Sequence, residues 1–195
     1  RHLVHTNALI TRSATAPLQL GFDSGESSPK SWLDLFPDAF AGPTPGFDLV
    51  IGNPPFLNQL FSSTKLQSSV SAEVTSAHGA MASKLSNPAT VFVLAAIDLA
   101  KSSGVIALIQ PLSFLATDEA ASARALLASA NTIDYLWICT EKVFDADVFV
   151  CGVVARIGKI SPVETKIVTG RGFELSIEKV GLGPAQGTWS VALTA

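Results

Sequence analysis

The stretch from Gly46 to Phe56, GFDLVIGNPPF, constrains the fold of this 195-residue chain more than any other. Three consecutive apolar residues, Leu49 to Ile51, are typical of a short strand that is buried on both faces, as in a parallel sheet. Gly52 predicts the end of this strand, because a residue without a Cβ allows a sharp bend. We therefore expect a buried strand that stops where a polar segment begins.

The four residues after Gly52 predict a stiff, extended segment that carries one amide and one ring. Pro54 and Pro55 each fix φ near about −65° and have no N–H donor. Pro54 also disfavours a helical conformation at Asn53. The carbonyl groups here have no helix or ladder partner close by, and Phe56 supplies a flat ring. This arrangement suits the binding of a planar group that bears an amino substituent.

The strand and the Asn53-Pro54-Pro55-Phe56 motif resemble the catalytic motif of methyltransferases that modify amino groups with S-adenosylmethionine. The longer string, which starts at Phe36-Pro37, resembles large adenine-specific DNA methyltransferases of restriction-modification and phage-defence systems. An ordinary Asn-Pro turn at the end of a strand is the alternative. The Phe-Asp-apolar-Gly strand directly before the motif favours the methyltransferase interpretation.

This resemblance implies an α/β fold, namely the Rossmann-like fold of S-adenosylmethionine-dependent methyltransferases. The chain would hold a partial form of it, strands three to seven, with an antiparallel edge strand. Residues 1–10 would be strand three and residues 47–52 the catalytic strand four. We expect residues 1–160 to form a partial catalytic domain, and residues 161–195 a hairpin or linker that leads to a target-recognition or other domain. The family's main cofactor loop lies in the N-terminal half, which would be missing here.

The resemblance also implies what the motif residues do. The Asn53 side-chain oxygen and the Pro54 carbonyl would accept hydrogen bonds from the amino group of an adenine flipped out of DNA. Pro55 would hold the motif extended, and Phe56 would stack on the base. Phe144 is a second candidate for base stacking, because the family places an aromatic residue after strand six. An anchor for a hairpin loop is the alternative role of Phe144.

Cofactor binding is the role that the resemblance implies for three residues. Asn7 and Ala8 occupy the position of the family's Gly-Asp-apolar pattern at the end of strand three. Asn7 can hydrogen-bond an adenine edge, since its amide both donates and accepts, but it lacks the charge of Asp. A strand-end Asn in a turn is the alternative. Asn53 would also border the cofactor.

Two helices are predicted after the motif. Pro88 suits the first turn of one, with Asn87 or Ser86 as its cap, and Gly104 is expected to end it as a left-handed residue. The other helix covers residues 120–130, and we expect Thr117 to cap it. Both helices are rich in apolar residues, which favours packing on a sheet.

Further strands are predicted from apolar runs. Residues 105–110 form a buried strand, and residues 133–139 and 148–157 form two more. Because no helix separates the last two, we expect an antiparallel pair at a sheet edge. A hairpin with its turn at residues 170–172 follows. The Ser/Ala-rich residues 57–86 suit a mobile loop or weak helix that covers the site.

Composition limits the function classes that remain. Hydrophobic residues make up 48% and charged residues only 15%, so a sizeable core is expected. The net charge of −3 does not fit a self-sufficient nucleic-acid binder, so most phosphate contacts would lie outside this chain. Cys139 and Cys151 lie in apolar runs and fit reduced core thiols of a cytoplasmic protein. The spacing of His2, His5 and His78 indicates no metal site, and we expect no signal peptide or membrane span.

The sequence therefore predicts a site-specific, adenine-specific DNA methyltransferase. Its cofactor would be S-adenosylmethionine and its partners DNA, the missing N-terminal half and a target-recognition domain. It would act within a restriction-modification or phage-defence system. Three alternatives stay open: a methyltransferase for RNA adenine, one for protein glutamine, and a non-catalytic module with a truncated methyltransferase fold.

Overall fold

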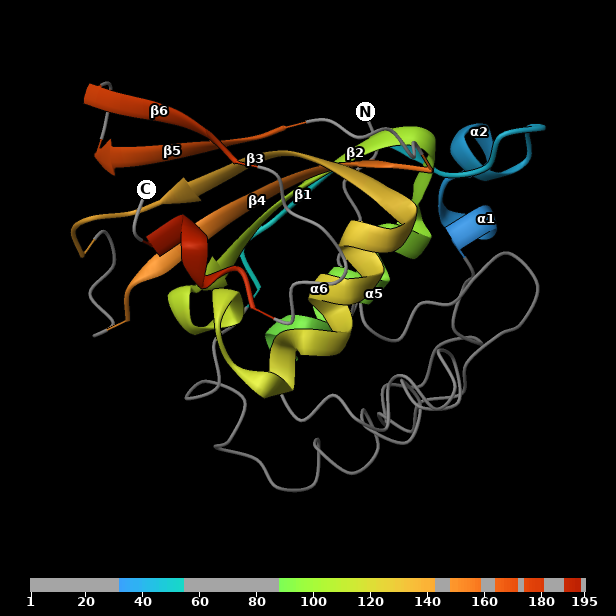
Figure 1. The fold of residues 1–195 in the computed structure, drawn as a ribbon. Coiled ribbons are helices and arrows are strands. Elements are labelled where there is room, and N and C mark those ends of the chain that lie inside the picture. The colour runs from blue at the N-terminus through green and yellow to red at the C-terminus, as the bar shows by residue number, and fades with distance from the viewer. Residues whose placement is uncertain are drawn as a thin grey trace.

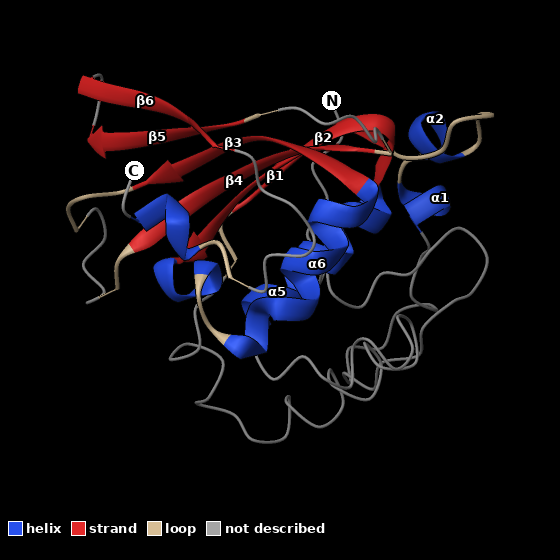
Figure 2. Cartoon of the chain, in the orientation of Figure 1, coloured by secondary structure: helices blue, strands red, loops and turns tan. Residues whose placement is uncertain are grey.

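The computed structural model describes residues 32–54, 88–142, 148–158, 164–171, 174–180 and 188–193 (Figure 1). They form one mixed six-stranded sheet in the order β1-β2-β4-β3-β5-β6, with helices α5 and α6 packed on one face (Figure 2). This α/β architecture confirms the predicted fold class. The elements are α1 (Trp32–Leu35), α2 (Pro37–Phe40), β1 (Phe47–Gly52), α5 (Pro88–Leu99), β2 (Ala100–Pro111), η2 (Leu112–Leu115), η3 (Asp118–Ala120), α6 (Ala121–Ala130), β3 (Asn131–Ile138), β4 (Val150–Ile157), β5 (Thr165–Arg171), β6 (Glu174–Val180) and η4 (Ser190–Leu193).

Strand β1 is parallel to β2, as the apolar run predicts, and ends at Gly52 opposite Leu108. Short aromatic helices support its beginning. The rings of Trp32, Phe36 and Phe40 surround that of Phe47, with centroids 5.1 to 6.1 Å from it. These ring contacts anchor the beginning of β1.

Strands β3 and β4 form the predicted antiparallel pair, but its predicted place at a sheet edge is wrong. Strand β4 lies inside the sheet, between β2 and β3, and is antiparallel to both. The predicted hairpin exists as β5 and β6, and β5 adds to the free edge of β3 in parallel. The sheet therefore continues past β3, and β6 is the antiparallel strand at that edge.

Helix α5 begins at Pro88 as predicted, whereas its cap candidates Ser86 and Asn87 lie outside the described residues. Its end differs from the prediction, because β2 already begins at Ala100. The left-handed residue is Ser103, with φ 70°, and not Gly104. Gly104 is required for a different reason: a Cβ there would lie 2.8 Å from the carbonyl oxygen of Phe47.

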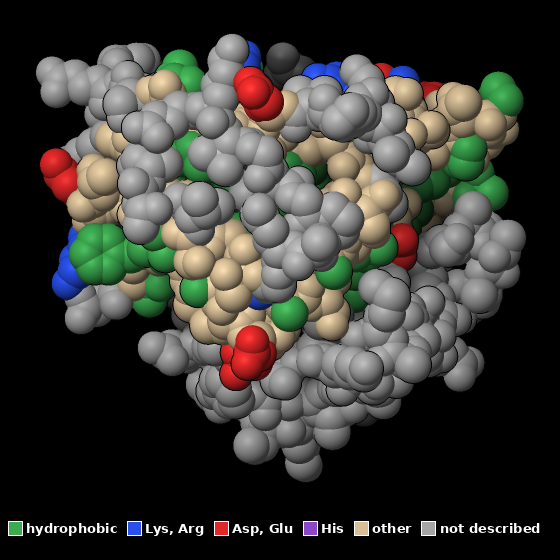
Figure 3. Space-filling view, viewed as in Figure 1, with side chains coloured by type: hydrophobic (Ala, Val, Ile, Leu, Met, Phe, Trp, Pro, Cys, Tyr) green, Lys and Arg blue, Asp and Glu red, His purple; other side chains and the backbone are tan. Residues whose placement is uncertain are grey.

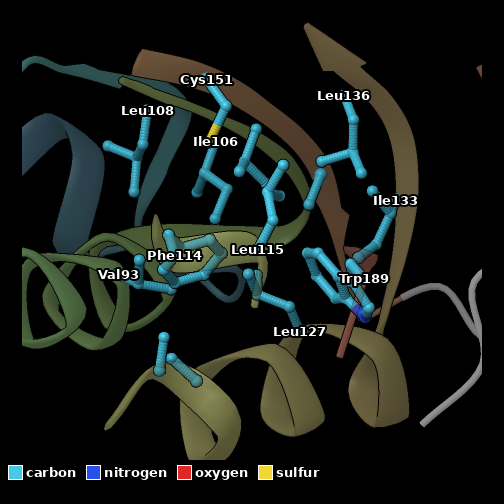
Figure 4. Packing of buried hydrophobic residues seen from close by; sticks show 14 of the residues in the cluster. Val93, Ile106, Leu108, Phe114, Leu115, Leu127, Ile133, Leu136, Cys151 and Trp189 are labelled. Carbon is cyan, nitrogen blue, oxygen red and sulfur yellow. The ribbon is translucent and has the colours of Figure 1, made fainter. Parts of the chain in front are cut away.

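The core lies between the sheet and the two helices, and Trp189 near the C-terminus completes it (Figure 4). Trp189 is fully buried, and its ring centroid lies 6.0 Å from that of Phe114. Its main-chain N–H donates to the carbonyl of Leu115 at 2.7 Å. The described residues beyond 160 thus share a sheet and a core with those before. That residues 161–195 lead to a target-recognition domain stays a prediction.

No helix among the described residues is long and apolar enough to cross a membrane.

Candidate active site

The candidate site lies at the carboxyl end of β1, where open α/β sheets bind their ligands. Asn53 follows Gly52 directly and is exposed, whereas Pro54 is buried. A Cβ on Gly52 would lie 3.0 Å from a methyl group of Leu108, so a glycine lets β1 and β2 approach closely at this end. The local sequence therefore presents one amide to solvent and anchors it through the proline that follows.

Strand β1 was expected to be buried on both faces, and this expectation is wrong because one face is exposed. Val50 packs against the core, but Leu49 is 52% exposed and Ile51 is 73% exposed. The reason is its position: among the described strands β1 is an edge strand, and the described helix α5 covers only the Val50 side. The exposed face of β1 therefore lies next to Asn53, which is exposed just after the end of the strand.

The segment after β2 follows the strand that pairs with β1. Two of its apolar residues, Phe114 and Leu115, are buried in the core and Leu112 packs against it, while Ser113 is exposed. The buried Arg124 guanidinium fixes the segment by donating to the carbonyls of Phe114 at 2.7 Å and Thr117 at 2.8 Å. Burial lowers the pKa of Arg124 below its usual value. Thr117 precedes the first helical turn as predicted, but its side chain makes no capping hydrogen bond.

One polar residue near the site, Gln110, has no role in the sequence analysis. It is fully buried near the end of β2. A signal for it exists in the sequence: Gln110 is the only polar residue in the apolar run VIALIQ. A polar residue at an inward position of a buried strand deserves a physical explanation.

Of the predicted site residues, the structure places Asn53 and Pro54. Pro55, Phe56 and Phe144, with the two cofactor candidates Asn7 and Ala8, lie outside the described residues, as does the predicted lid at residues 57–86. Their roles stay predictions.

The two cysteines are free and buried, as predicted. Cys151 lies in β4, and Cys139 directly follows β3, where its N–H donates to the carbonyl of Val150 at 3.2 Å. Burial raises the pKa of the Cys151 thiol to about 12. Both thiols are therefore structural groups in this part of the fold.

Positive charge is sparse around the described surface. On the face shown in Figure 3, the described Lys and Arg side chains form no continuous patch. Two cations on the sheet are engaged in ion pairs, Lys101 with Asp48 and Arg156 with Asp134, the latter at 2.7 Å. The Lys101 ammonium, through a hydrogen bond and its charge, lowers the pKa of Asp48.

Solved structures share this fold. The chain aligns with the DNA complex of the type IIL restriction-modification enzyme MmeI with a TM-score of 0.51 and 18% identity, over 70% of this chain and 19% of MmeI. A protein described as a class I S-adenosylmethionine-dependent methyltransferase, from Listeria monocytogenes, aligns with a TM-score of 0.50 and 12% identity, over 64% and 36% of the two chains. The fold is therefore that of α/β methyltransferases.

The family follows from the sequence. The model of the Eco57I restriction-modification methylase family matches residues 12–144, which is well over half of the chain. The chain belongs to this family. No curated protein matches it.

The solved structures are much longer than this chain. A modification subunit of a type I restriction enzyme from Vibrio vulnificus aligns over 66% of this chain but 26% of its own, with 13% identity and a TM-score of 0.46. Across the three structures, this chain covers between 19% and 36% of the partner in the alignment.

Proposed function

We propose that this chain supplies the part of a DNA adenine N6-methyltransferase that holds the target amino group. The observation that carries the proposal is the carboxyl end of β1, where Asn53 is exposed and Pro54 is buried directly after the strand. The proposal also draws on the family, whose model matches the residues around this motif. The enzyme would act within a restriction-modification or phage-defence system.

The chemistry follows from the acceptors that this segment offers. An exocyclic amino group is a poor nucleophile, because its lone pair is delocalised into the ring. The Asn53 side-chain oxygen and the Pro54 carbonyl accept hydrogen bonds from its two N–H groups. This favours a more tetrahedral nitrogen and aims its lone pair in one direction, which is a positioning effect. Phe56 and Phe144 are proposed to stack on the base, which must first leave the duplex.

The cofactor of this proposal is S-adenosylmethionine, which supplies an electrophilic methyl group when bound. Asn53 fits the cofactor's border as an exposed polar group at the carboxyl end of β1. Neither β1 nor β2 carries an acidic residue at its carboxyl end that would bind the cofactor's hydroxyl or amino groups. Asn7 and Ala8 are proposed to add one more contact. The described residues therefore hold the target side of the site more than the cofactor side.

A second polypeptide segment is proposed to complete the site along β1. The strand has an edge that no described strand pairs with, and its apolar residues Leu49 and Ile51 are exposed beside Asn53. An unpaired edge with exposed apolar side chains is a surface that natural sheets cover. We propose that the half of the catalytic domain with the cofactor loop covers it.

DNA contacts outside these residues are part of the proposal. The net charge of −3 and the paired cations of the sheet give little attraction for phosphates. We propose that a target-recognition domain provides most of them. MmeI was solved with DNA, which agrees with a DNA substrate for this fold. The two free thiols agree with the reducing cytoplasm, where cellular DNA would be available.

The test is methyl transfer by the complete protein that contains this chain, with radiolabelled cofactor and adenine-containing DNA in single turnover. Mass spectrometry of the digested nucleosides then identifies N6-methyladenine. We expect Asn53→Ala to lower the rate of methyl transfer by at least about 100-fold, because the amino group loses its oriented acceptor. Cofactor affinity should change little.

Asn53→Asp is the matched variant, since it keeps an acceptor of nearly the same size. It should retain more activity than Asn53→Ala. Near-normal turnover of Asn53→Ala would contradict the acceptor role and leave an ordinary Asn-Pro turn. Label on RNA or on glutamine in protein, with none on DNA, would favour the other methyltransferases. No label on any of them would favour a non-catalytic module.

A further inference from the structure

Gln110 stands out because its buried amide has no hydrogen-bond partner. The side chain is fully buried, and neither Nε2 nor Oε1 contacts a partner among the described residues. Burying an unpaired amide is costly, and an apolar residue of similar volume would avoid that cost. The mechanism proposed above does not use this residue. We therefore expect the amide to form a hydrogen bond in another state of the protein.

The register of the sheet places Gln110 beside the motif. Burial alternates along β2, so Ile106, Leu108 and Gln110 point to the same face. Leu108 is paired with Gly52, and a methyl group of Leu108 lies 3.0 Å from the position that a Cβ of Gly52 would occupy. Gln110 lies two residues beyond Leu108, as Pro54 lies two residues beyond Gly52.

The chain after Gly52 continues this alternation. Asn53 is exposed and Pro54 is buried, so Pro54 lies on the same side as Gly52 and Gln110. Asn53, as the residue before a proline, favours extended backbone, which keeps the period of two. Neighbouring strands are about 4.8 Å apart, a distance that the side chain of a glutamine spans.

We propose that Gln110 is a positioning residue for the Asn53-Pro54 segment. Pro54 and Pro55 have no N–H group, so carbonyl oxygens are the main-chain groups that they offer to a neighbour. In the enzyme with a bound target base, the Gln110 Nε2 donates to a carbonyl of Asn53 or Pro54. Each carbonyl oxygen has two lone pairs, so it still accepts from the base. The amide thereby fixes the direction of the acceptor without touching the substrate.

This inference rests on the proposed function, and Gln110→Met tests it in the complete protein. Methionine has a similar volume but no amide. We expect the single-turnover rate of methyl transfer to fall about 10- to 100-fold, since small misplacement of a reacting group has effects of this size. KM for DNA and the Kd of S-adenosylmethionine should stay within about 2-fold, because the residue touches neither.

Leu136→Met is the matched control, since Leu136 is fully buried in β3, away from the motif. It should keep the wild-type rate. The melting temperature of Gln110→Met should equal or exceed that of the wild type, because the amide has no hydrogen-bond partner among the described residues.

Each other result has a definite meaning. A wild-type rate for Gln110→Met overturns the inference and leaves the proposed function intact. A clearly lower melting temperature overturns it too, because the amide would then be a structural group. A wild-type protein that transfers no methyl group overturns the proposed function itself, and the positioning role falls with it.

Discussion

The β1 edge of the sheet and the region around β3 and β4 differ in how completely their apolar side chains are covered. At the β1 end, Ile51 is 73% exposed and Leu49 is 52% exposed, directly beside the candidate site. Inside the sheet, around β3 and β4, Leu136 and Val150 are 0% exposed, and Trp189 is inserted into the core with 0% exposure. Burial of apolar surface is the main stabilising term in folding. Stability therefore resides in the region around β3 and β4, while the candidate chemistry lies on the less buried strand.

The largest expected effect on stability concerns the buried region around Trp189. Trp189→Ala should lower the free energy of unfolding by about 3–5 kcal/mol, because it leaves a large cavity beside Phe114. Urea denaturation of the complete protein measures this. Trp189→Phe should cost less, since the indole Nε1 has no hydrogen-bond partner among the described residues. A loss below about 1 kcal/mol for Trp189→Ala would mean that the C-terminal segment does not contribute to the core.

The same substitution on neighbouring strands compares an exposed position with a buried one. Ile106→Ala should cost about 2–5 kcal/mol, because Ile106 is fully buried in β2. Ile51→Ala should change the free energy of unfolding of the 195-residue chain, in which its side chain is exposed, by no more than about 0.5 kcal/mol. A large cost at Ile51 in the complete protein, together with a large cost at Ile106, would show that another segment covers β1 there.

A smaller effect, confined to high pH, follows from Cys151. Burial holds the pKa of its thiol near 12, whereas the ordinary value is 9.0. Above about pH 9 the thiol ionises in the unfolded chain but stays protonated in the folded one, so unfolding is favoured. Its contribution to stability is complete below about pH 9 and declines as the pH rises toward 12.

Urea denaturation at about pH 7.5 and about pH 10.5 measures this decline. Cys151→Ala loses stability at the lower pH because it opens a small cavity. The further loss between the two values should be smaller in Cys151→Ala than in the wild type. An equal further loss would show that other groups cause the decline.

Sequence reasoning identified the local features well where neighbouring residues determine them. Gly52 ends β1 and Pro88 begins α5. These features depend on the conformational limits of glycine and proline and on nearby apolar spacing. Burial of the cysteines followed from their apolar flanks for the same reason.

Features that depend on distant parts of the chain were not predicted. The apolar run in β1 gave no sign that Leu49 and Ile51 would face solvent, because run length does not reveal the covering layer. The position of β4 inside the sheet depends on its pairing with β2 as well as with β3, and the pairing with the distant β2 has no local signal. The sequence alone assigns no role to Gln110, because only three-dimensional packing reveals that its side-chain amide has no hydrogen-bond partner among the described residues.

The position of β4 has a consequence for the synthesis of the chain. Strand β4 pairs with both β2 and β3, which are made before it. Until Val150 to Ile157 have emerged from the ribosome, the strand that pairs with both β2 and β3 is absent. The edges of β2 and β3 that face each other therefore stay unpaired. A nascent chain that stalls in the segment before β4 thus presents two open edges to other polypeptides. Protease digestion of nascent chains of stepped length should show protection of β2 and β3 only after β4 has emerged, and earlier protection would refute this order.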